Sequence, residues 1–171
     1  MKPVFELPAN PEPMELHPKA PAPGEPLRLH HGFCYGCGDD APVGLRLKVF
    51  VGEGFRLTAE MAVEPWMQGG PGVIHGGILA AAFDELMGTA PLLIGVPPVT
   101  GHLEVDFAEP IPLGSVLKFD AEVVAKERRK VFVRSTAHLA DPARPVAFAH
   151  GIFIAIDVRR HFAAYKENAI T

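Results

Sequence analysis

One acidic side chain among very small residues is the first feature of this sequence that could do chemistry. The segment "HGGILAAAFDELMG" predicts a helix, and steps of about 100° per residue place Asp84 on a side made of small residues. These are Gly77, Ala80, Ala81 and Gly88. Such a side lets a ligand or another backbone approach, although plain exposure to solvent also explains it. Asp84 is therefore the candidate functional acid, and we expect Glu85, turned about 100° away, to reach solvent or to cap a neighbouring element.

A glycine-rich loop leads directly into this helix. Its sequence "GGPGVIHGG" contains Pro71 and five glycines in nine residues, which gives the backbone unusual conformational freedom. The N–H groups of Gly76 and Gly77 lie at the helix N-terminus, where they lack acceptors within the helix and the dipole favours negative charge. We expect them to bind an oxyanion, such as the one that develops on an acyl carbonyl under attack. His75 precedes them, either hydrogen-bonded at the helix start or in contact with the ligand.

Other classes of ligand are disfavoured by the motifs and the charge. The chain has no GxxxxGK[ST] pattern and no strand followed by GxGxxG, so nucleotide binding is not indicated. A formal net charge of -4 gives no general attraction to nucleic acid. The N-terminus lacks the apolar core of a signal peptide, and no apolar run reaches about 18 residues. We therefore expect a soluble, cytoplasmic protein without membrane contact.

One long helix must present these residues. The apolar pattern predicts that it runs from Gly76 to Ile94 and ends before Gly95, because the following Pro97-Pro98 pair cannot continue it. Its bulky side, which we expect to bury against a sheet, consists of Ile78, Leu79, Phe83, Leu86 and Met87.

Strands are predicted on both sides of this helix. Upstream, "GLRLKVFVGEGFRLTAEMAV" alternates apolar and polar residues in two runs separated by a glycine turn, as in an antiparallel hairpin. Downstream, further strand candidates are "VTGHLEVDFAEP", "GSVLKFDAEVVAKE", "KVFVRSTAHLA" and "PVAFAHGIFIAID". One helix covering five to six antiparallel strands is an α+β fold.

The two ends of the chain differ from this unit. Eight of the 18 prolines fall within residues 1 to 26, a composition that disfavours helix and interior strand alike. We expect residues 1–30 to form a Pro-rich extended or disordered arm, loosely held or wrapped around a neighbouring subunit. Residues 31–158 would form the main domain, and residues 159–171 a C-terminal tail.

Two segments of this chain resemble a known family. "HGGILAAAFDELMG" is similar to the signature of hotdog-fold acyl-CoA thioesterases of the phenylacetate-thioesterase-like type, within the 4-hydroxybenzoyl-CoA thioesterase superfamily. "CYGCGDDAPVGLRLKV" resembles the segment that precedes it in a branch with Cys-Phe-x-Cys-Gly openings. The resemblance covers residues 31 to 157. It implies a long helix wrapped by an antiparallel sheet, homodimers or tetramers whose sheets join, and active sites at the subunit boundary.

The resemblance also implies roles for individual residues. The Gly76 amide would donate to the thioester oxygen. Asp84, nine positions after His75, would act as general base or nucleophile, and the reaction would need no cofactor. Gln68 would be the polar residue that often precedes the loop, with a surface amide as the alternative. Thr100 stands where a Ser or Thr often orients water, with a plain strand residue as the alternative.

Two further segments contain residues of ligand-binding types. "KERRK" joins two predicted strands, and its Arg128, Arg129 and Lys130 could meet the phosphates of coenzyme A, although a solvated hairpin tip is the simpler interpretation. "HHGFCYGCG" holds four potential soft ligands, which are His30, His31, Cys34 and Cys37. Zinc sites usually draw their ligands from separated segments, so we expect a turn packed by Phe33 and Tyr35 rather than a metal site.

Three functions on this fold remain open. Hydrolysis of an acyl-CoA thioester is the leading hypothesis, with the acyl group unspecified. The alternative is a non-catalytic acyl-CoA binding or regulatory module, in which Asp84 is dispensable. A dehydratase would need a hydratase-type motif that the sequence lacks. Residues of the type that lines an acyl pocket are Trp66, Met67, Phe83 and Met87, and each is equally suited to a core.

Overall fold

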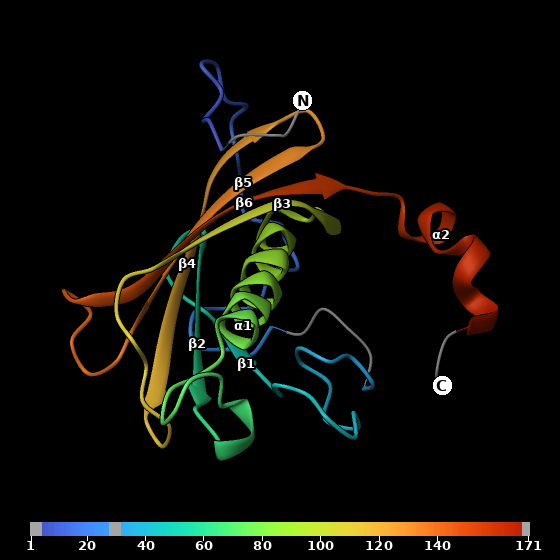
Figure 1. Cartoon of the computed structure of the whole chain (residues 1–171). Coiled ribbons are helices and arrows are strands. Elements are labelled where there is room, and N and C mark those ends of the chain that lie inside the picture. Colours follow the sequence, from blue (N-terminus) through green and yellow to red (C-terminus); the bar gives the residue numbers. More distant parts are fainter. Residues whose placement is uncertain (1–4, 28–31, 169–171) are drawn as a thin grey trace.

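An antiparallel sheet and the helix α1 form the body of the molecule. The computed structural model describes residues 5–27 and 32–168. In this part of the chain six strands form one sheet in the order β1-β2-β4-β5-β6-β3, which curves around α1 (Figure 1). The strands are β1 (Lys48–Val51), β2 (Arg56–Ala62), β3 (Pro98–Phe107), β4 (Val116–Glu127), β5 (Lys130–His138) and β6 (Pro145–Ala155). The predicted α+β fold, one long helix wrapped by an antiparallel sheet, is confirmed.

Alternating burial accounts for the strands. Along β2, exposed and buried residues alternate without exception, and β4 follows the same pattern over its first half. Such segments expose one face to solvent and pack the other on the core. β1 and β2 pair antiparallel, which confirms the predicted upstream hairpin, and the four downstream candidates are β3, β4, β5 and β6.

The helix α1 (Gly76–Thr89) is extended by a 3-10 turn, η2 (Ala90–Ile94). The change occurs at Pro91, which has no N–H to donate to the preceding turn. Gly95 ends the run with φ 71°, in the left-handed region that favours glycine. The predicted end at Ile94 is therefore confirmed, although its last turn is tighter than an α-helix.

The helical run Gly76–Ile94 is long and apolar enough to cross a membrane by length and composition alone. This differs from the expectation that no segment would reach that length. A core helix passes the same test, and 56% of the most apolar window is buried inside the molecule. The run is apolar because it fills the curve of the sheet.

The bulky side of α1 forms the centre of the core. Of its five predicted members, Leu79, Phe83, Leu86 and Met87 are buried, and Ile78 is partly buried. Phe83 packs edge-on against Phe119 of β4, with ring centroids 5.3 Å apart. Burial of one such side chain contributes about 1.5–3 kcal/mol. This packing fixes the rotation of the helix and thereby the direction of Asp84.

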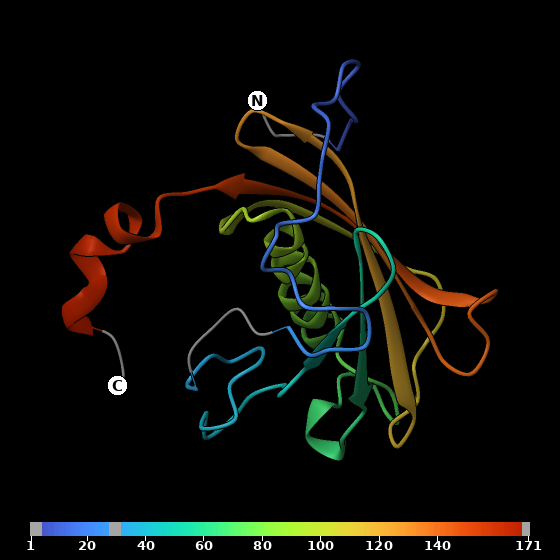
Figure 2. The ribbon, with the colours of Figure 1, turned by 180° about the vertical axis from the view of Figure 1, so that it is seen from behind.

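The N-terminal arm is extended, as predicted, but it is held on its own chain. Its backbone hydrogen-bonds to η2 through His17 and to β1 through Leu27. Figure 2 shows this blue segment crossing α1 on its way to the β1–β2 hairpin. The Glu12 carboxylate accepts hydrogen bonds from Lys126 Nζ and, at 2.7 Å, from the Arg128 N–H. The described part of the arm is therefore anchored at three places rather than loosely held.

After β6 the chain leaves the body. α2 (Val158–His161) and η3 (Ala163–Asn168) lie away from the sheet in both ribbon views (Figures 1 and 2). Asp157 caps α2, because its Oδ1 accepts the Arg160 N–H at 3.0 Å. The predicted boundary between domain and tail at residue 158 stays a prediction, and residues 169–171 lie outside the described part.

We expect Glu12→Gln to release the middle of the arm. The hydrogen bond from Lys126 and then that from the Arg128 N–H lower the pKa of Glu12 below its ordinary value. The attachment is therefore complete at neutral pH and is lost as the pH falls through that lowered pKa. Hydrogen exchange followed by mass spectrometry should show a loss of protection at the Arg128 amide, relative to its intrinsic exchange rate at the same pH. We expect this loss in the variant at neutral pH and in the wild type only in acid.

Glu15→Gln changes an exposed glutamate of the same arm and is the matched control. It should leave the exchange of Arg128 unchanged. Equal protection in all three proteins would mean that Glu12 does not fasten the arm.

Candidate functional site

Asp84 and Thr100 meet where α1 faces β3. The Thr100 hydroxyl donates a hydrogen bond to Asp84 Oδ1 at 2.7 Å. Asp84 is half-buried and Thr100 is exposed, so the carboxylate is accessible from outside the chain. The bond orients one carboxylate oxygen and leaves Oδ2 for another partner. Two candidates chosen from the sequence on different grounds are therefore neighbours in space.

A β-bulge in β3 accounts for the direction of the Thr100 side chain. The pairing of β3 with β6 shifts register between Thr100 and His102, so Gly101 is the extra residue. A Cβ on Gly101 would lie 2.7 Å from Ile154 Cγ1, which leaves no room for a larger residue. Because bulges redirect the side chains beside them, Gly101 lets the hydroxyl turn toward the helix.

The helix N-terminus offers one donor rather than the expected two. His75 Nδ1 accepts the Gly77 N–H at 2.9 Å and thereby caps α1. The Gly76 N–H has no acceptor among residues 5–27 and 32–168. The expectation of a donor pair is therefore corrected to Gly76 alone, since the Gly77 N–H is already engaged by the cap.

The loop before α1 is held in shape by Gln68. Its Oε1 accepts the Gly72 N–H at 3.2 Å, and its backbone forms a bridge with Ile74. Gly69 packs directly on His75, where an added Cβ would lie 2.7 Å from the His75 Cα. The contact of Gln68 is with the loop, and it supports the backbone that presents the start of the helix.

A mostly apolar hollow opens beside Gly76. Its lining residues are Val73, Ile74, Gly76, Leu79, Phe107, Ala108, Glu109, Pro110 and Ile111. A Cβ on Gly76 would lie 3.4 Å from the Phe107 ring, and 56% of that residue's surface is exposed. The unpaired donor therefore borders a surface that can shelter an apolar group from water.

Gly76 and Asp84 lie more than two helical turns apart. Eight residues at about 1.5 Å each separate them by about 12 Å along the axis of α1. The first N–H groups of a helix also point along the axis away from its body, so an oxygen bound there lies farther still from Asp84. The donor and the carboxylate of one chain are therefore too far apart to act on the same carbonyl.

Arg128, Arg129 and Lys130 form the tip of the β4–β5 hairpin, as the simpler interpretation of "KERRK" predicted. Arg128 occupies the turn with φ 53°. Arg129 Nε donates to Ala155 O at 3.0 Å, which ties the tip to the end of β6. All three side chains are exposed.

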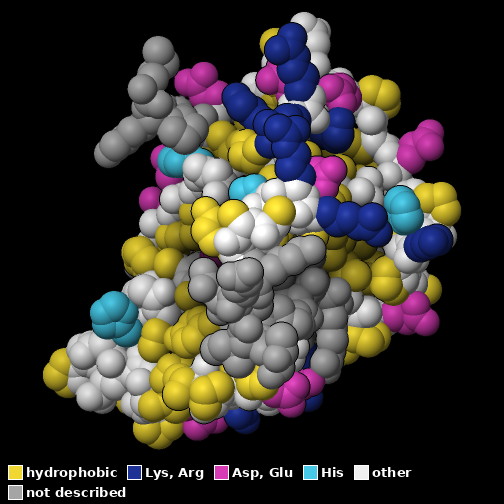
Figure 3. Space-filling view, turned by 90° about the vertical axis from the view of Figure 1, so that its right-hand side faces the viewer, with side chains coloured by type: hydrophobic (Ala, Val, Ile, Leu, Met, Phe, Trp, Pro, Cys, Tyr) yellow, Lys and Arg dark blue, Asp and Glu magenta, His cyan; other side chains and the backbone are white. Residues whose placement is uncertain are grey.

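This hairpin tip lies at the same end of the sheet as the Asp84–Thr100 contact. Ala155 is paired with Pro98, two residues before Thr100 on β3. Arg129 and Arg160 line a common hollow there. Figure 3 shows Lys and Arg side chains gathered in the upper part of one face. The site therefore has cationic groups near one end.

Of the four residues of acyl-pocket type, one is at the surface. Phe83, Met87 and Met67 are core residues, exposed by 2% or less. Trp66 is 48% exposed and lines a hollow with Val43. The pattern of bulky residues alone could not separate core from pocket.

Glu85 is buried, which corrects the expectation that it reaches solvent or caps an element. It is 8% exposed, and Cys34 Sγ donates to its Oε2 at 3.7 Å. Phe33 and Tyr35 are 37% and 47% exposed, so they do not pack the turn as expected. His30 and His31 lie outside the described residues. A helical wheel gave the direction of Glu85, but it could not show that a distant loop lies there.

The comparisons with known proteins agree with this architecture. Residues 71–146 match the family model described as the thioesterase superfamily. Acyl-coenzyme A thioesterase THEM4 of Xenopus laevis is 34% identical over 99 residues, which are 58% of this chain and 45% of that protein. The Bos taurus protein of the same name is 32% identical over 93 residues, or 54% of this chain and 38% of that protein. The chain thus spans less than half the length of these relatives.

Solved structures show the same fold. The Escherichia coli PaaI protein from the phenylacetic acid degradation operon superposes with a TM-score of 0.61 at 21% identity, over 66% of this chain and 81% of that one. The smu.793 protein of Streptococcus mutans, solved bound to acetyl CoA, gives 0.60 at 20% identity, over 64% and 88%. The hotdog fold implied by the sequence resemblance is confirmed.

His75→Ala should destabilise the start of α1 by removing the acceptor of the Gly77 N–H. Loss of an N-cap acceptor costs about 0.5–2 kcal/mol of the free energy of unfolding. Chemical denaturation would measure that loss. His75→Asn keeps a side-chain acceptor suited to this position and should recover most of it. Equal stability of His75→Ala and the wild type would contradict the capping role.

Proposed function

Because residues 71–146 match the thioesterase superfamily model and the chain has a hotdog fold, we propose that this protein hydrolyses an acyl-CoA thioester to a free acid and CoA. The observation that carries the proposal is the hydrogen bond between Thr100 and the Asp84 carboxylate at an accessible edge of the chain. A relative named acyl-coenzyme A thioesterase supports the same activity.

In the proposed reaction, the Gly76 N–H stabilises the negative charge that develops on the thioester oxygen. Asp84 Oδ2 accepts a proton from water, the water oxygen bonds to the carbonyl carbon, and the C–S bond breaks as the proton passes to the departing thiolate. Alternatively, Asp84 Oδ2 bonds to the carbonyl carbon and the C–S bond breaks to release the CoA thiolate, and water then cleaves the resulting anhydride to the free acid and the Asp84 carboxylate, with its proton passing to the thiolate. In both routes Thr100 is a positioning residue that holds Oδ1.

The complete site requires two copies of the chain. The Gly76 donor and the Asp84 carboxylate of one chain are about 12 Å apart along α1, too far for one carbonyl. A second copy with its helix antiparallel would bring its Asp84 opposite the first copy's Gly76. β3 supports this arrangement, because in the described part of the chain it is the edge strand next to β6 and carries exposed residues. We therefore propose a homodimer, alone or as half of a tetramer.

Coenzyme A would extend from this site toward the hairpin tip. Arg128, Arg129 and Lys130 offer cationic groups for its phosphates at the end of the sheet that holds Asp84. The bound acetyl CoA of the smu.793 structure is consistent with this class of ligand. The acyl group stays unassigned, and the cytoplasmic location stays a prediction from composition.

A non-catalytic acyl-CoA binding module is the second candidate. It would use the same loop and hollow, and it would leave the carboxylate without a role. The Thr100 hydrogen bond favours the enzyme, since a carboxylate held in one orientation at an accessible edge is what base or nucleophilic catalysis requires.

Gly76→Pro should remove the oxyanion donor while keeping the helix. Proline lacks the N–H and is well tolerated at the first helical position, and His75 before it has ψ 130°, the conformation that proline prefers in its neighbour. We expect kcat for acyl-CoA hydrolysis to fall about 10²–10³-fold. Gly76→Ala keeps the N–H and adds a similar Cβ, so it should retain most activity. Similar kcat values for the two variants would exclude this N–H as the donor.

Asp84→Asn should lower kcat about 10²–10⁴-fold for every member of a panel of acyl-CoA substrates. Its affinity for acyl-CoA should stay within a few-fold of the wild-type value. Thr100→Val should lower kcat about tenfold with little change in KM, and Thr100→Ser should restore it. Calorimetric binding measured beside kinetics separates the two candidates. Wild-type protein that binds acyl-CoA without hydrolysing any member of the panel would establish the binding module instead.

A further inference from the structure

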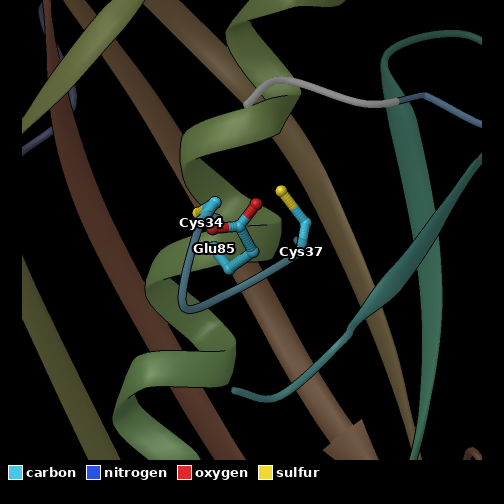
Figure 4. A group of neighbouring side chains, drawn as sticks. All are labelled: Cys34, Cys37 and Glu85. Carbon is cyan, nitrogen blue, oxygen red and sulfur yellow. Dashed lines mark hydrogen bonds between the residues drawn. The ribbon is translucent and has the colours of Figure 1, made fainter. Parts of the chain in front are cut away.

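Two cysteines and one glutamate converge at a place that the proposed hydrolysis does not use. Cys34 and Cys37 come from the loop before β1, and Glu85 comes from α1 (Figure 4). One ligand atom of each residue lies within 4.8 Å of the other two. Segments about fifty residues apart in the chain thus bring two thiols and a carboxylate together.

These separations are close to those of ligands around a zinc ion. Zinc binds cysteine sulfur at about 2.3 Å and carboxylate oxygen at about 2.0–2.2 Å, and a tetrahedron of such bonds places its ligand atoms about 3.4–3.8 Å apart. Cys34 Sγ lies 3.7 Å from Glu85 Oε2. The three ligand atoms, all within 4.8 Å of one another, are therefore already near the spacing that one ion requires.

The loop backbone is arranged around this cluster. Gly36 lies directly on the carboxylate, where an added Cβ would be 2.1 Å from Glu85 Oε2. The Gly38 N–H donates to Cys34 O at 2.8 Å and closes the turn that carries both thiols. The Leu47 N–H donates to Gly36 O at 2.9 Å. A turn joined to β1 and packed on α1 therefore presents two sulfurs to one buried acid.

The chemistry of the three groups favours a soft divalent cation. Glu85 supplies a buried carboxylate, 8% exposed, beside the two thiols. Thiolates select zinc over calcium and magnesium, which prefer oxygen ligands alone. The three ligands come from separate segments, as zinc ligands usually do, because Glu85 lies on α1 and the two cysteines lie on the loop.

We propose that Cys34, Cys37 and Glu85 bind a zinc ion that fastens the loop to α1. Two thiolates and one carboxylate provide the protein ligands, and water completes the tetrahedron. Binding displaces the protons of both thiols, so the apparent affinity rises with pH. The ion holds the helix at the residue after Asp84, on a different side from the small residues.

Metal titration of the reduced 171-residue chain tests this directly. After chelator treatment and buffer exchange, we expect one zinc ion per chain, displacement of two thiol protons, and a higher Tm on zinc addition. Cobalt in place of zinc should give the intense charge-transfer absorption of thiolate ligation. Reduced wild-type protein with two titratable thiols that binds no stoichiometric zinc would overturn the proposal. This test uses no substrate, so it is independent of the proposed hydrolysis.

Variants then assign the ligands. Cys34→Ser and Cys37→Ser should each remove the cobalt charge-transfer band or halve it, and Glu85→Gln should weaken zinc binding by at least about tenfold. Glu53→Gln, in the exposed turn between β1 and β2, is the control and should bind as the wild type does. Unchanged affinity of a folded Glu85→Gln protein would contradict the site. If that variant does not fold, the wild-type cobalt spectrum and the cysteine variants decide.

Discussion

The fixed rise of the α-helix is the constraint on which the proposed site depends. It places the Gly76 N–H and the Asp84 carboxylate about 12 Å apart along α1, with the N–H pointing away from the acid. Neither group can be moved without breaking the helix whose apolar side fills the sheet. A single chain therefore carries two separate halves of the proposed site, and the proposed chemistry requires a second copy of the same helix.

Several features of β3 follow from the same requirement. It is an edge strand, and its Gly101 bulge turns the Thr100 hydroxyl toward Asp84. Unprotected edge strands are a hazard unless they are paired or covered. In the proposed homodimer this edge lies near the subunit boundary, where an accessible carboxylate is useful. The small residues around Asp84 fit the same proposal, since they would let the backbone of a second copy come close.

Periodicity made the fold and part of the site predictable from the sequence. Alternation located the strands, and the helical wheel separated the bulky side of α1 from the side of Asp84. The wheel failed for Glu85, because it gives a direction and not the loop that lies there, and that loop has no periodicity to place it. The Gly77 N–H was misjudged because its engagement depends on the ring orientation of His75, which no pattern encodes. The arm was misjudged because its anchors, such as Glu12, act on residues more than a hundred positions away.

Subunit mixing tests whether the site is shared between two chains. Asp84→Asn and Gly76→Pro chains should each be inactive alone. Refolding equal amounts together should restore about a quarter of wild-type activity, because half of the randomly formed dimers are mixed and each then has one complete site of two. A mixture that stays inactive, although native mass spectrometry shows mixed dimers, would mean that the site is not formed by Asp84 of one chain and Gly76 of the other.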